Sequence, residues 1–174
     1  GTEIPAAVAA WTRVKAGSNF DDSQGFAGAG QNGVGASLTN IFSKSFIGIT
    51  CDGDNTMTIK CENNLSSIDW KVKSGGKQGT KVTVVPDFEH FECKAIDDIV
   101  LSIFKDQLQT LAVTFPEIQF KFNNERIQGN FKKYAKQFDE NAIVMETDNI
   151  QFAIGSSADG FRHLSYINSI HTKA

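Results

Sequence analysis

The residues with the clearest capacity for chemistry form a glycine-rich segment, Gly28–Ser43, which reads GAGQNGVGASLTNIFS. Glycines allow consecutive backbone N–H groups to point toward one ligand, and a helix beginning near Ala36 would add the positive end of its dipole. Both features favour binding of an anion such as phosphate. The segment therefore predicts a phosphate-binding loop, although the glycines alone do not identify the phosphate compound.

Two familiar phosphate-binding motifs fit this segment poorly. GAGQNG matches the G-x-G-x-x-G fingerprint of a dinucleotide-binding turn, and Asp52 follows about 20 residues later. However, the residues before GAGQNG are polar, where this fold needs a buried strand. The chain also turns back at Asp52 through DGDN instead of entering another helix. A P-loop is disfavoured because Gln78 follows Lys77 where Ser or Thr is needed. A glycine-rich helix cap without any ligand is a further alternative.

The length, net charge and apolar content of the chain limit the classes of protein to which it can belong. A chain of 174 residues can form one domain, or one domain and part of a second. Its net charge of −3 gives no global basic field for nucleic acid. No apolar run approaches the ~20 residues of a membrane-spanning helix. The chain has no initiator Met, and we interpret it as an internal fragment.

The three cysteines predict neither a zinc site nor a disulfide framework, because none of them are spaced as C-x-x-C. If the DGDN turn joins two antiparallel strands, Cys51 faces Thr56 while Cys61 faces Phe46. The two sulfurs are then more than ~15 Å apart, too far for a bridge. Reduced thiols in a cytoplasmic protein are expected.

Hydrophobic patterning predicts an α+β fold with a largely antiparallel sheet. After a long flexible loop over residues 17–35, helical spacing of apolar residues begins at Leu38. Short β-branched segments separated by turn signals then predict an antiparallel meander over 46–50, 56–61, 67–73 and 81–87. A helix over 97–113, a hairpin in 118–129, a short helix over 130–138 and three strands in 142–172 complete the prediction.

Four colinear blocks resemble the ATPase subunits of type II DNA topoisomerases, members of the GHKL superfamily that includes gyrase B. The blocks are GSNFDD (17–22), GQNGVGASLTNIFS (30–43), GTKVTVVPDFEHF (79–91) and YINSIHTK (166–173). Within that family the chain resembles the T-even-bacteriophage type through LQTLAV and NFKKYAKQFDE. The resemblance implies a GHKL (Bergerat) two-layer α/β sandwich with a mixed, mostly antiparallel sheet. It also implies a boundary, with an ATPase domain lacking its N-terminal part over 1–140 and the beginning of a ribosomal-S5-like transducer domain over 141–174.

The resemblance further implies which residues contact ATP. Ser18 and Asn19 match positions that reach toward the ribose and phosphates, and Thr80 matches a threonine that helps to hold adenine. LTNIFS is expected to anchor the glycine-rich segment to the core. Side-chain charge departs from the family at Gln31, where Arg is usual, and at Ser37, where eukaryotic relatives commonly have Lys. The positions that wrap the triphosphate are Gly30, Gln31, Asn32, Gly33, Val34, Gly35, Ala36 and Ser37.

The implied function is that of an ATP-operated gate. In the family, ATP binding closes the glycine-rich segment and favours dimerisation of ATPase domains around DNA, and hydrolysis resets the gate. The catalytic Glu and the magnesium-binding Asn lie upstream of the aligned residues, so we assign no catalytic residue or metal ligand here and expect this segment alone to be inactive. The expected partners are DNA, other topoisomerase subunits and ATP with Mg²⁺, in the cytoplasm of a host cell and without a membrane. The alternative is a nucleotide-binding interaction module without hydrolysis.

Two other groups of residues have less specific interpretations. Lys132, Lys133 and Lys136 share one face of the short helix over 130–138, which is either a solvated face or a patch that contacts DNA. The histidines have no metal-ligand spacing, and Asp52 is interpreted as a turn residue.

Overall fold

The computed structural model describes residues 4–16, 32–167 and 170–172, and the chain divides into two compact units, Gly1–Ala95 and Ile96–Ala174. The domain boundary expected between residues 140 and 141 stays a prediction. None of the helices in the described part is long and apolar enough to cross a membrane.

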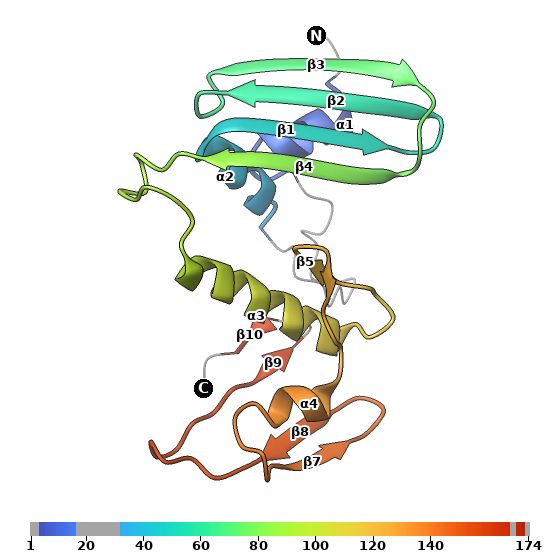
Figure 1. Ribbon diagram of the computed structural model, residues 1–174. Coiled ribbons are helices and arrows are strands. Elements are labelled where there is room, and N and C mark those ends of the chain that lie inside the picture. Colours follow the sequence, from blue (N-terminus) through green and yellow to red (C-terminus); the bar gives the residue numbers. More distant parts are fainter. Residues whose placement is uncertain (1–3, 17–31, 168–169, 173–174) are drawn as a thin grey trace. The chain divides into compact units, whose positions relative to one another are not determined.

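The first unit is built on a four-stranded antiparallel sheet with the order β3-β2-β1-β4 (Figure 1). Its strands are β1 (Ser43–Cys51), β2 (Asn55–Glu62), β3 (Ser67–Ser74) and β4 (Gly79–Pro86). All four strands predicted from the sequence are present. The meander is correct for the first three, but β4 pairs with β1 and not with β3, so the predicted strand order is wrong at that point.

The connection from β3 to β4 explains the strand order. It must cross the ends of β2 and β1, a span of about 14 Å at the usual strand spacing, in the few residues between Ser74 and Gly79. Gly75 and Gly76 have φ angles of 79° and 137°, which favour glycine. A Cβ on Gly76 would lie 2.2 Å from the Thr56 hydroxyl oxygen. The absence of a side chain at Gly76 therefore lets the connection pass close to Thr56 at the beginning of β2.

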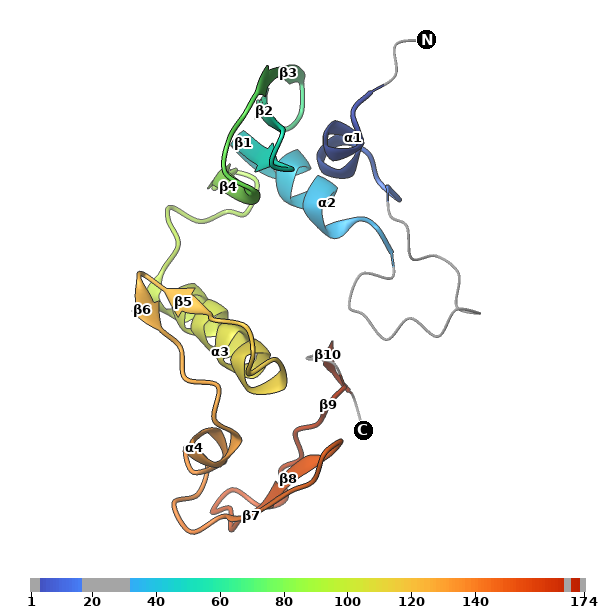
Figure 2. The same ribbon diagram turned by 90° about the vertical axis from the view of Figure 1, so that its right-hand side faces the viewer.

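Helices α1 (Ala6–Thr12) and α2 (Gly35–Ile41) lie on the same side of this sheet (Figure 2). The core between the helices and the sheet is centred on Trp11, whose ring lies against the backbone of Gly48. A Cβ at Gly48 would be 2.4 Å from that ring. The buried residues of this core are Val8, Trp11, Phe46, Met57, Ile59 and Cys61.

The strand register predicted around Cys51 and Cys61 is confirmed. Cys61 pairs with Phe46 and Cys51 pairs with Thr56, and all three cysteines are free. Burial raises the pKa of the Cys61 thiol, and a contact with the Asn40 side chain partly opposes that effect.

The second unit begins with helix α3 (Asp98–Thr114), whose N-cap Asp97 accepts a hydrogen bond from the Val100 N–H. The predicted hairpin forms from β5 (Lys121–Phe122) and β6 (Glu125–Arg126), and the short helix is α4 (Phe131–Ala135). The described part of the tail has four short strands in two hairpins, where three strands were predicted. They are β7 (Ile143–Glu146), β8 (Gln151–Ile154), β9 (Tyr166–Ile167) and β10 (Ile170–His171).

Tyr134 is the main buried aromatic residue described in the second unit. Burial raises its pKa to about 12, against an opposing hydrogen bond with Thr110. The buried face of α4 therefore holds a phenol that stays neutral throughout the physiological range.

The contact between Trp11 and Gly48 gives a test of the helix–sheet packing. Gly48→Ala is expected to lower the free energy of unfolding by about 1–3 kcal/mol, because the added methyl group overlaps the ring. Urea denaturation followed by tryptophan fluorescence measures the effect. Gly35→Ala is the matched control, since a Cβ there meets no described atom within 4 Å. A Gly48→Ala variant as stable as the unmodified chain would contradict this packing.

Candidate functional site

The amino end of helix α2 carries backbone amides that the helix's own hydrogen bonds do not use. Val34, the N-cap residue, provides no side-chain hydrogen bond to the helix. The first intrahelical bond runs from the Leu38 N–H to the Val34 carbonyl, at 2.9 Å. The amides of Gly35, Ala36 and Ser37 precede that bond, so the helix does not satisfy them. A Cβ at Gly35 would meet no described atom within 4 Å, and a ligand can therefore approach this backbone closely.

The structure describes six of the eight residues predicted to wrap the triphosphate, Asn32 to Ser37. Asn32 is exposed and Gly33 has a φ of 58°, which aims the chain into the helix. Ser37 is 1% exposed, and its hydroxyl donates to the Val34 carbonyl at 3.0 Å. Ser37 can therefore offer its backbone N–H, but not its side chain, to a ligand. Outside the described residues lie Ser18, Asn19, Gly30 and Gln31.

Thr80, the predicted adenine contact, lies on the sheet. It pairs with Thr50 across β1 and β4, and their hydroxyl oxygens are 2.9 Å apart. Because side chains alternate along strands, Thr80 shares a face with Val82, whose partner Gly48 lies under Trp11. Thr80 is thus on the side of the sheet that the helices cover. It lies beside the carboxyl end of β1, whereas α2 precedes the amino end of that strand.

A polar interface anchors α2 to the rest of the unit. Asn40 is 1% exposed, and its side-chain amide donates to the Trp11 carbonyl at 2.8 Å. Ser43, also buried, donates its hydroxyl to the Thr39 carbonyl. The anchoring role predicted for LTNIFS is therefore present, but polar residues of that run are its most buried members, whereas Leu38 is 39% exposed. Helical spacing of apolar residues did not indicate this.

A second cluster, at the junction of α2 and β1, was not singled out from the sequence. Asp87 is buried and accepts from the Asn64 side-chain amide at 2.9 Å and from the Lys44 ammonium group at 3.1 Å. Burial acts to raise the pKa of Asp87, but these bonds and one from the His90 N–H outweigh burial and lower it. The only sequence signal was the position of Asp87 in the GTKVTVVPD block.

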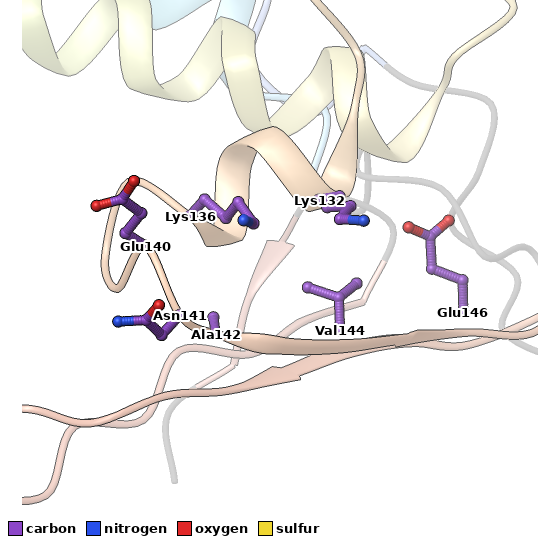
Figure 3. Close-up of a pocket in the computed structure, with 7 residues that line it drawn as sticks. All are labelled: Lys132, Lys136, Glu140, Asn141, Ala142, Val144 and Glu146. Carbon is purple, nitrogen blue, oxygen red and sulfur yellow. The ribbon is translucent and has the colours of Figure 1, made fainter.

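The cationic face of α4 lies beside a hollow of mixed charge (Figure 3). Lys132 and Lys136 line it together with Glu140 and Glu146. The carboxylates offset the lysines, so the arrangement favours the solvated-face interpretation over a DNA-binding patch. None of the predicted nucleotide contacts lines this hollow.

No group of three or more His, Cys, Asp or Glu side chains in the described ranges could hold a metal ion.

Comparison with solved structures defines the class of protein. The crystal structure of the ATPase region of Saccharomyces cerevisiae topoisomerase II matches with a TM-score of 0.81 and 30% identity, covering 94% of this chain and 46% of the yeast chain. The ATPase and transducer domains of DNA topoisomerase II from Balamuthia mandrillaris match with a TM-score of 0.85 and 26% identity, covering 93% and 44% of the two chains. This chain belongs to the ATPase region of the type II DNA topoisomerases and has the GHKL-type α+β fold.

Sequence comparison gives the more particular relationship. The chain is 53% identical to the DNA topoisomerase large subunit of Enterobacteria phage T4, over 99% of this chain and 34% of the relative. It is 32% identical to the mitochondrial DNA topoisomerase 2 of Dictyostelium discoideum, over 90% of this chain and 14% of the relative. It thus spans about a third of the phage relative's length. No protein-family model matches it.

Asn40 gives a test of how α2 is anchored. Asn40→Ala is expected to lower the free energy of unfolding by about 1–3 kcal/mol, because it removes a buried hydrogen-bonding side chain from the Trp11 carbonyl. Chemical denaturation monitored by circular dichroism measures the change. Thr39→Ala is the control, since the exposed Thr39 hydroxyl contacts only the Gly35 carbonyl of its own helix. Equal effects from the two variants would contradict the anchoring role.

Proposed function

We propose that this chain forms part of the ATP-binding gate of a type II DNA topoisomerase. The observation that carries the proposal is the amino end of α2, whose first-turn amides are bonded by no described residue, within a chain whose fold matches topoisomerase II ATPase regions. Backbone amides at a helix start suit the phosphates of ATP. Residues Asn32–Ser37 would hold the phosphates by their backbone, and Thr80 would contribute to holding adenine.

In the whole enzyme, ATP controls conformation. Binding of ATP closes the glycine-rich segment and favours dimerisation of ATPase domains, which traps a DNA segment, and hydrolysis then releases it. The ligand can drive this change only by binding more tightly to the closed state. DNA, a second copy of the ATPase region and other topoisomerase subunits are the proposed partners, in the cytoplasm of a host cell.

The resemblance assigns the catalytic glutamate and the magnesium ligand to a part of the ATPase region upstream of the aligned blocks. We therefore propose that the present residues bind nucleotide without hydrolysing it. Magnesium-dependent ATP hydrolysis by this chain, purified free of contaminating ATPases, would contradict that statement. The second candidate, a nucleotide-binding interaction module, predicts in addition that the longer protein fails to hydrolyse ATP.

Calorimetric titration with a non-hydrolysable ATP analogue tests the proposed site. The affinity is expected to fall as phosphates are removed from the analogue to ADP and then to AMP, because the loop contacts phosphate. Gly35→Ala is expected to raise Kd by about tenfold, equivalent to about 1.4 kcal/mol, since its methyl group occupies the space in front of the helix amides. Ala142→Gly, in the hollow beside α4, is the control and should leave Kd unchanged. Equal affinity for the ATP analogue and AMP would contradict phosphate binding at α2.

A further inference from the structure

Four consecutive carbonyl groups at the junction of α2 and β1 are each bound by a residue from elsewhere in the first unit. The Ile41 carbonyl accepts from the Asn64 side-chain amide at 3.0 Å. The Phe42 carbonyl accepts from the Asp87 N–H, and the Ser43 carbonyl from the Asn64 N–H, both at 2.9 Å. The Lys44 carbonyl accepts from the Asn63 N–H at 2.9 Å. We call these four bonds the junction clamp.

Asn64 is central to the clamp because its side chain contacts both the helix and Asp87. The amide nitrogen lies 3.0 Å from the Ile41 carbonyl oxygen and 2.9 Å from Asp87 Oδ2. The backbone of Asn64 has a φ of 58°, a left-handed conformation that asparagine tolerates better than most residues. Both the side chain and the backbone of Asn64 are therefore suited to this position.

Asp87 fixes the other side of the clamp. Its N–H bonds the Phe42 carbonyl, and its carboxylate is held by Asn64, by Lys44 and, at 3.3 Å, by the His90 N–H. Two oxygens with three donors leave little freedom to rotate. The carboxylate thus orients the Asn64 amide that reaches α2.

Helix α2 needs such external support. It is seven residues long, and isolated helices shorter than about 12 residues are marginal in water. Its amino end has no side-chain cap, so its fixed contacts are at the carboxyl end and along its buried face. The clamp therefore holds the end of the helix opposite to the first-turn amides.

We propose that Asn64 and Asp87 are positioning residues that hold α2, and with it the phosphate-binding amides, in the orientation that nucleotide binding requires; this rests on the proposed function. Neither residue is placed to touch the ligand. Both act through the Ile41–Phe42 end of the helix, and their removal loosens the helix without changing the groups offered to phosphate.

Amide hydrogen exchange of the helix tests the clamp without a ligand. Asn64→Gly removes the side chain but keeps a backbone that adopts positive φ readily, so strain does not confuse the result. Exchange of the Leu38 and Phe42 amides is expected to accelerate between about threefold and tenfold, the factor given by one typical hydrogen bond. Exchange in α3 should not change. Asn124→Gly, at a φ of 68° in the β5–β6 turn, is the matched control and should leave α2 unchanged.

Nucleotide affinity of the same variants tests the positioning role. With the fold verified by circular dichroism, Asn64→Gly and Asp87→Asn should each raise Kd for the non-hydrolysable ATP analogue by about threefold to tenfold. The double variant should show less than the product of the two effects, because the residues share a hydrogen bond.

The two ways of failing are distinguishable. Unchanged exchange in α2, or faster exchange with unchanged Kd, would overturn the positioning role while nucleotide binding stands. No binding of the analogue by the unmodified chain would overturn the proposed function, and the positioning role with it.

Discussion

Helix α2 is too short to be stable alone, and this constraint governs the candidate site. Seven residues form few intrahelical bonds, so the orientation of the helix is imposed by its surroundings. Asn40 ties its buried face to the Trp11 carbonyl, and the junction clamp holds its carboxyl end. Among the described residues none bonds the first amides at the amino end, and these amides are the groups available to a phosphate. A rigid attachment at one end and available amides at the other suit a site that must bind phosphate closely.

The sheet supports this arrangement in two ways. Trp11 lies on Gly48, which brings α1 close to β1 and allows Asn40 to reach the carbonyl of Trp11. The crossover from β3 to β4 places β4 beside β1, and Asp87 follows β4 directly at the α2 junction. If β4 had paired with β3, two strands, β2 and β3, would separate Asp87 from that junction. The strand order is therefore a condition for the clamp.

Much of the fold could be predicted from the sequence, because local signals were strong. Strand segments, the Asp97 helix cap and the register of Cys51 and Cys61 followed from alternation and turn residues. The partner of β4 could not, since patterning identifies a strand but not its neighbour. Asn64 was missed for a related reason: its amide acts on Ile41, 23 residues away, and only the folded chain brings them together. The family resemblance predicted a role in ATP binding for the glycine-rich segment. It did not predict that polar residues, Asn40 and Ser43, would attach this segment to the core.

The central claim is that the amides at the start of α2 receive the phosphates of ATP. Amide chemical shifts, measured by NMR on isotope-labelled chain during titration with a non-hydrolysable ATP analogue, test it most directly. We expect the largest shift changes at the amides of Gly33, Gly35, Ala36 and Ser37, with a smaller change at Thr80. Shifts concentrated instead around Lys132 and Lys136, with the α2 amides unmoved at saturation, would contradict it.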